Sequence, residues 1–298
     1  MLSDLQKSIL HTLAFFAAQE MPLTLLELHN FLKREHPKQP PVGLFELKNS
    51  AEKELSSKVT FQDGLYTLRG YERLFNLRQR KYPHSIRLFK KAVRWANLLR
   101  FFPFVRSVAI SGTLAHTNAG EKSDIDLFII TEPKRMFLAR FLVSFYFQIF
   151  GIRRHGQKIA GRFCLNHYTV LGKSFYQDRN LYTAMLYTNF IPVFGARHLR
   201  GFWEANLPWI KEFFIAPRPS SAHIFEYAHT SSNWLQRFVE FVLNPLAEIL
   251  ERILGGYQKR RIQQSDTVLV SDEELSLHPG SKGQRILAEY RRIVSTLL

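Results

Sequence analysis

Apolar residues in the first part of the chain recur at helical intervals. Their spacing from Leu5 to Phe16 predicts a helix that ends near Gln19, and similar spacing predicts helices to about residue 33 and over 44–57. The first two helices begin with capping-box pairs: Ser3 with Gln6, and Thr24 with Glu27. We therefore expect the chain to open with three short helices.

An alternating pattern follows. Two short stretches, 59–62 and 65–68, flank Asp63-Gly64, a dipeptide typical of a tight hairpin turn. Three helices and a hairpin resemble a winged helix, which implies an N-terminal domain over 1–70. Those residues carry eight Lys/Arg against eight Asp/Glu, whereas phosphate contacts require a positive excess. We therefore expect DNA binding to be unlikely and the module to serve packing or protein contact.

Residues 71–104 have a helical pattern that we expect to be broken at Pro83 and stopped at Pro103. Within it, 73–100 holds nine basic residues and no acidic one, and the whole chain has a formal charge of +16. Such a segment attracts polyanions, so its basic face is either a site for a triphosphate or RNA, or a solvated surface.

The strongest candidate for chemistry lies between two apolar strands, 105–111 and 125–130. The first runs into Gly112-Thr113, and the second opens at Asp124 and Asp126. Residues two apart on a strand lie on one face, and two adjacent carboxylates repel each other unless a cation lies between them. Magnesium binds such oxygens together with substrate phosphates, so the pair predicts a divalent metal site.

Gly112-Thr113, Ala115 and Ser123-Asp124-Ile125-Asp126-Leu127 resemble the Gly-Ser and Asp-x-Asp signature of the DNA polymerase β-like nucleotidyltransferase superfamily. The resemblance implies an α+β fold with a small mixed sheet flanked by helices. It implies that Asp124 and Asp126 bind Mg2+ and are catalytic, and that Gly112 and Thr113 hold the phosphates of a nucleoside triphosphate, most simply ATP. Ser111 and Ser123 are further candidates for nucleotide binding. Thr117 stands where a second glycine is common.

In that superfamily a third carboxylate generally comes from the next strand, here 163–171, which contains none. Alternation would put Cys164, Asn166 and Tyr168 on one face, so Asn166 is the candidate neutral ligand in the missing place. We expect Cys164 and His167 to be core residues. Asp178 and Glu204 are candidates only if the chain folds back.

The rest of the chain has mostly helical patterns, among them a long amphipathic helix beginning at residue 233. We therefore expect three domains: 1–70, a nucleotidyltransferase core over 71–175, and a helical C-terminal region over 176–298. The longest apolar run, 137–152, is too short and interrupted to span a bilayer, so no membrane is expected. A single cysteine and the absence of a signal peptide favour a cytoplasmic protein.

The leading hypothesis is a magnesium-dependent nucleotidyltransferase that moves a nucleoside monophosphate to an acceptor hydroxyl. The basic composition favours RNA or another anionic acceptor over a cationic one, and a small molecule stays open. Because a third carboxylate is missing, the alternative is a degenerate module that binds a nucleotide or RNA without chemistry. A winged-helix transcriptional regulator is the weakest alternative.

Overall fold

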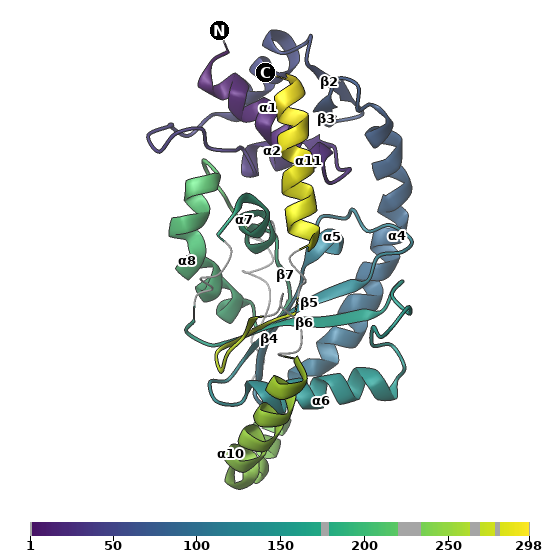
Figure 1. Ribbon diagram of the computed structural model, residues 1–298, viewed down its shortest axis with the longest axis vertical. Coiled ribbons are helices and arrows are strands. Elements are labelled where there is room, and N and C mark those ends of the chain that lie inside the picture. The colour runs from purple at the N-terminus through teal and green to yellow at the C-terminus, as the bar shows by residue number, and fades with distance from the viewer. Residues whose placement is uncertain (1, 174–178, 220–233, 263–268, 278–280, 298) are drawn as a thin grey trace.

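Two β-sheets organise the chain in the computed structural model, which describes residues 2–173, 179–219, 234–262, 269–277 and 281–297 (Figure 1). The combination of helices with a mixed sheet agrees with the predicted α+β class. One apolar core lies mainly under the N-terminal elements, and a second lies under one face of the larger sheet.

The N-terminal elements follow the predicted order. They are α1 (Asp4–Ala17), β1 (Leu23–Thr24), α2 (Leu25–Asn30), α3 (Leu44–Asn49), the π-helical turn η1 (Ser50–Glu54), β2 (Val59–Gln62) and β3 (Leu65–Leu68). Both predicted capping boxes are present, and Asp63 and Gly64 have the positive φ values that a tight hairpin turn needs. The strands form a small antiparallel sheet in the order β1-β3-β2, in which β1 was not predicted.

Helix α4 (Arg73–Ala96) connects this region to the larger sheet and is followed by the 3-10 turn η2 (Asn97–Phe101). The prediction of a break at Pro83 is wrong, because α4 continues through it. Both halves are buried against protein: Leu74 belongs to the first core and Leu88 to the second. Packing on both sides of Pro83 offsets the one backbone hydrogen bond that proline removes.

The larger sheet has the order β7-β4-β5-β6-β9-β8, and all its pairs are antiparallel except β5 with β6. Its strands are β4 (Val105–Ile110), β5 (Ile125–Thr131), β6 (Phe163–Val170), β7 (Ile191–Phe194), β8 (Leu269–Val270) and β9 (Glu274–Ser276). The short helix α5 (Gly112–Ala115) follows β4.

Helices cover both faces of this sheet. Residues of α4, α6 (Met136–Ile149) and α10 (Trp234–Ile262) pack with one face in the second core. Residues of α7 (Leu181–Thr188) and α8 (Ala196–Phe213) pack with the other face in the first core. None of the helices in the described ranges combines the length and hydropathy that a bilayer crossing requires.

The segment over 176–298, expected to be helical, also supplies strands β7, β8 and β9 to the larger sheet. These strands have two to four residues each, too short to give a recognisable alternating pattern. The last helix, α11 (Ser281–Leu297), returns to the start of the chain and packs along α1, as Figure 1 shows. The two ends of the sequence are therefore neighbours in space.

Candidate functional site

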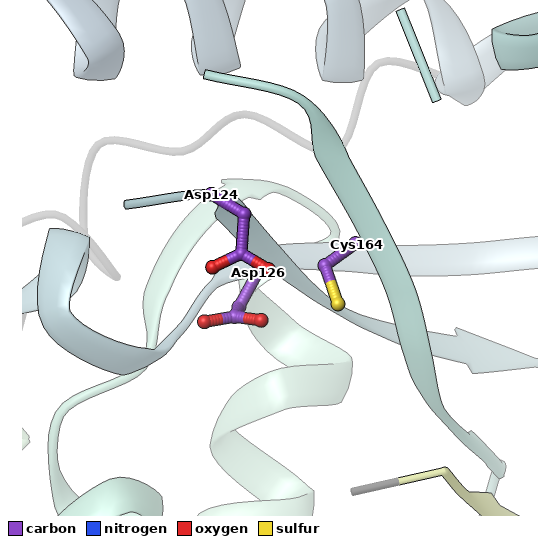
Figure 2. Close-up of side chains that lie close together, drawn as sticks. All are labelled: Asp124, Asp126 and Cys164. Atoms are coloured by element: carbon purple, nitrogen blue, oxygen red, sulfur yellow. The ribbon is translucent and has the colours of Figure 1, made fainter. Parts of the chain in front are cut away.

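Two carboxylates and one thiol lie together where β5 and β6 begin (Figure 2). Asp124 directly precedes β5, Asp126 is its second residue, and Cys164 pairs with Asp126 across the parallel strands. One ligand atom from each of the three side chains lies within 4.8 Å of the others. The prediction that Asp124 and Asp126 are close together is confirmed, and the thiol of Cys164 lies with them.

Gly112 is fitted closely to Asp126. Its φ is +65°, and a Cβ atom built on it would lie 2.5 Å from Asp126 Oδ2, closer than real Cβ contacts. The amide of Ser111 donates to the Asp126 carbonyl at 3.0 Å, which fixes the backbone before the turn. Only glycine fits at position 112, because the backbone passes directly over the carboxylate. Thr117, where the family resemblance suggested glycine, also has a positive φ, of 51°.

Cys164 is buried, as predicted, but it faces the carboxylates instead of the second core. The register of β6 shifts between its pairings with Asp126 and Phe128, so one extra residue enters β6 after Cys164. Tyr168 consequently packs in the second core, and the prediction that it shares a face with Cys164 is wrong. Burial, together with the charges of Asp126 and Asp124, raises the pKa of the thiol well above its ordinary value, so Cys164 is protonated.

Asn166, the predicted replacement for the third carboxylate, lies in the irregular part of β6, and its side chain is outside the described residues. The position opposite Asp126 belongs to Cys164. His167 is buried, with its ring 4.7 Å from that of Phe128, as expected for a core residue. Glu204 is exposed on α8, and Asp178 lies outside the described residues.

The positively charged side chain of Arg154 lies beside the cluster. Arg154 Nη1 is 2.5 Å from Asp124 Oδ2 and 3.5 Å from Cys164 Sγ. This guanidinium offsets part of the repulsion between the two carboxylates. Arg154 lies in an irregular loop, which has no periodicity from which this contact could be predicted from the sequence.

A pocket of about 380 Å3 adjoins the Gly112-Thr113 turn. Its wall comes from four distant segments: residues 18–21 after α1, the turn over 112–118, α7, and α11. Helix α11 contributes two basic residues, Lys282 and Arg285, and acidic Glu20 and Glu289 are also in the wall. The predicted phosphate-binding residues Gly112 and Thr113 therefore border a cavity lined by two cationic side chains, Lys282 and Arg285. The position of these two side chains in the wall was not predicted from the sequence.

Tyr182, on α7, packs against α11 at the pocket. It lines the pocket, and burial together with the charge of Asp126 raises its pKa. A Cβ on Gly283 would lie 2.8 Å from Tyr182 Cδ1, so α11 is packed tightly against this ring. Asp124, Asp126 and Cys164 are not in the pocket wall, and the pocket and the carboxylate cluster adjoin each other at Gly112, which lines the pocket and lies against Asp126.

The turn after Gly112 brings two buried polar side chains to the pocket wall, His116 and Asn118. Burial lowers the pKa of His116 to about 4, so its ring is neutral at pH 7. Asn118 Nδ2 donates to the Gln19 carbonyl at 3.1 Å, and its Oδ1 has no hydrogen-bond partner within the described structure.

The two predicted serines have different positions. Ser111 is buried directly before Gly112, between β4 and the pocket turn. Ser123 Oγ accepts a hydrogen bond from the Gly120 amide at 3.0 Å, which closes the loop before Asp124. Ser123 therefore shapes the loop that presents the first carboxylate.

No protein-family model, curated protein or solved structure matches this chain.

Proposed function

We propose that the protein is a divalent-metal-dependent nucleotidyltransferase. The observation that carries the proposal is the fit of Gly112 over Asp126, because it joins the turn beside the pocket to a pair of carboxylates. Carboxylate oxygens suit Mg2+ or Mn2+, so Asp124 and Asp126 would hold the ion. Bound there, the metal would neutralise charge on the reacting phosphate.

The pocket would take the nucleoside triphosphate, most simply ATP. Gly112 and Thr113 would hold its phosphates at the edge nearest Asp126, and the cations of Lys282 and Arg285 would offset the negative charge. In the reaction the acceptor hydroxyl would lose its proton to water as its oxygen bonds to the α-phosphorus, the bond from that phosphorus to the bridging oxygen would break, and pyrophosphate would leave. Positioning and charge neutralisation are the main contributions of a protein to such a step.

The acceptor would be a hydroxyl on an anionic molecule. The basic stretch over 73–100 forms most of α4, which contacts α5 beside the pocket turn. A polyanion such as RNA would be attracted to it, and a small anionic acceptor is the simpler case. With either acceptor, the proposed reaction would take place in the cytoplasm.

A second candidate, a nucleotide-binding module without chemistry, is favoured by Cys164. A protonated, buried thiol opposite Asp126 accepts a proton poorly, and Arg154 already pairs with Asp124. Both features favour binding over turnover. This second candidate includes a module that binds RNA without transferring a nucleotide to it.

The test is transfer of label from α-labelled nucleoside triphosphates to RNA and to a panel of small hydroxyl compounds, with pyrophosphate release measured in parallel. We expect Mg2+-dependent release by the wild type and none by the Asp124→Ala, Asp126→Ala double variant. Undiminished transfer by the double variant contradicts the metal assignment. Nucleotide binding without release across the panel assigns the second candidate instead.

A further inference from the structure

Helix α10 is apolar on two opposite faces. Its inner face packs into the second core beside α6: Ala247 is fully buried, and a Cβ on Gly255 would lie 3.1 Å from the Phe137 ring. The outer face, defined by six residues, is between 57% and 79% exposed: Phe238, Phe241, Val242, Leu246, Ile249 and Ile253. A helix that is apolar all round is normally covered on all sides.

Two of the acidic residues of α10 lie on its inner side. Glu240 pairs with Arg106 and accepts from the Phe104 amide, so it belongs to the inner side. Glu251 accepts from the amides of Phe137 and Leu138 at the start of α6. The exposed charges in the middle of α10, Glu248 and Arg252, pair with each other at 2.5 Å beside the apolar side chains, so no unpaired charge lies in this described part of the helix, and few charges are typical of the centre of a homodimer interface.

We propose that the outer face of α10 is the interface with a second copy of this chain, with the two α10 helices antiparallel about a twofold axis. Six large apolar side chains so exposed, with Trp234 and Tyr257 at the ends, present on the order of 1,000 Å2, and a standard interface buries about 800 Å2 on each partner. The face is therefore large enough to hold a dimer by itself.

The two ends of α10 explain why the pairing is antiparallel. The N-terminal end carries Trp234, Phe238 and Phe241 with one cation, Arg237, and the C-terminal end carries Arg260 and Arg261 beside Lys259, which pairs with Asp272 at 2.6 Å. Antiparallel packing brings Arg260 and Arg261 of one copy to the rings of the other, whereas parallel packing would bring four arginines together. An axis between Leu246 and Ile249 would place Val242 against Ile253 and Phe238 against Tyr257.

A membrane surface fits the same face less well. An interfacial helix keeps a polar face in water and has cations along it, whereas the other face of α10 is packed on protein. Three of its five cations lie at the C-terminal end, Arg237 lies near the other end, and Arg252, in the middle of the helix, is paired with Glu248 at 2.5 Å. At one end of the molecule, away from α1 and α11, α10 also leaves the nucleotide pocket clear of the interface (Figure 1).

Sedimentation equilibrium of the full chain at physiological salt tests the proposal. We expect a mass of about twice 34.9 kDa for the wild type. The Phe241→Glu, Ile249→Glu variant should raise the dimer dissociation constant by at least about a hundredfold, as removal of central interface residues does. The matched control is Phe45→Glu, an 85% exposed aromatic residue on α3, which should leave the dimer intact. A monomeric wild type at 100 µM overturns the proposal.

Disulfide formation tests the orientation, since the natural cysteine, Cys164, is buried. A mixture of Phe238→Cys and Tyr257→Cys chains should give the mixed disulfide, whereas predominant self-linking of Phe238→Cys contradicts the antiparallel arrangement. A monomer that sediments with anionic phosphatidylserine vesicles through Phe241 would assign the face to a membrane and overturn the dimer. The Phe241→Glu, Ile249→Glu variant should bind Mn2+ with the same affinity as the wild type. Loss of the dimer would then be independent of the proposed metal site.

Discussion

The Asp126 side chain lies in the space that a Cβ atom at Gly112 would need: such an atom would be 2.5 Å from Asp126 Oδ2. We expect Gly112→Ala to lose metal binding and to destabilise the fold by about 1–3 kcal/mol, because the clash adds to an unfavourable φ. Mn2+ titration and thermal unfolding measure the two effects. Gly201→Ala, with open space around an α8 glycine, should instead be neutral or stabilise by up to about 1 kcal/mol.

Replacing Cys164 by Asp should restore a three-carboxylate site. The additional charge would bind Mg2+ more tightly, and we expect roughly tenfold higher affinity together with lower stability in EDTA, since the position is buried. Cys164→Ser is the control, because it keeps a small neutral side chain. Equal Mg2+ affinity in both variants would show that position 164 does not reach the ion.

In the proposed site, Arg154 would compete with a metal for Asp124. Removing the guanidinium in Arg154→Gln should raise Mn2+ affinity by several-fold, as expected for a half-exposed ion pair of about 1 kcal/mol. Electron paramagnetic resonance of free Mn2+ provides the measurement. Arg153→Gln, one residue earlier in the same loop, should leave the affinity unchanged. A decrease in affinity would instead mean that Arg154 holds Asp124 in the binding position.

Lys282 should contribute to nucleotide binding and not to metal binding. Lys282→Met keeps the length of the side chain but removes the charge beside the pocket, so we expect about tenfold weaker triphosphate binding by calorimetry. Mn2+ affinity without nucleotide should stay constant. Arg291→Met on the same helix, outside the pocket wall, is the matched control. Equal losses in both variants would point to general electrostatics.

Glu274 makes stability depend on pH. Burial raises its pKa from 4.5 to about 8, and its Oε1 has no hydrogen-bond partner in the described structure. The folded carboxyl keeps its proton where the unfolded one ionises, so stability is full below pH 4.5 and falls as the pH rises towards 8. Glu274→Gln should remove on the order of 1 kcal/mol of this loss, allowing for partial solvent screening.

Urea unfolding at pH 5 and pH 8 measures the difference. Glu273→Gln is the control, since the neighbouring carboxylate is exposed and paired with Lys173. An unchanged pH dependence in Glu274→Gln would mean that Glu274 is ionised in the folded protein.

Local signals in the sequence predicted local structure well. Ser3 with Gln6 and Asp63 with Gly64 act within four residues, and both form the expected cap and turn. The close approach of Asp124 and Asp126 was also predictable, because strand alternation alone determines it.

The rest of the site depends on irregular or distant structure. Cys164 meets the carboxylates and Tyr168 does not, because one extra residue in β6 interrupts the alternation. Lys282 reaches the pocket through the packing of α11 on α1 and α7, more than a hundred residues from Gly112. Neither a bulge nor such a long-range contact leaves a periodic pattern in a single sequence.

The return of α11 to α1 has a consequence for biosynthesis. The pocket wall combines residues 18–21 with Lys282 to Glu289, which a ribosome makes much later. A nascent chain can form the N-terminal hairpin and the carboxylate cluster, but it has no complete pocket until α11 has emerged. In the proposed function, a nascent chain would therefore bind a nucleotide only after residue 289 has been synthesised.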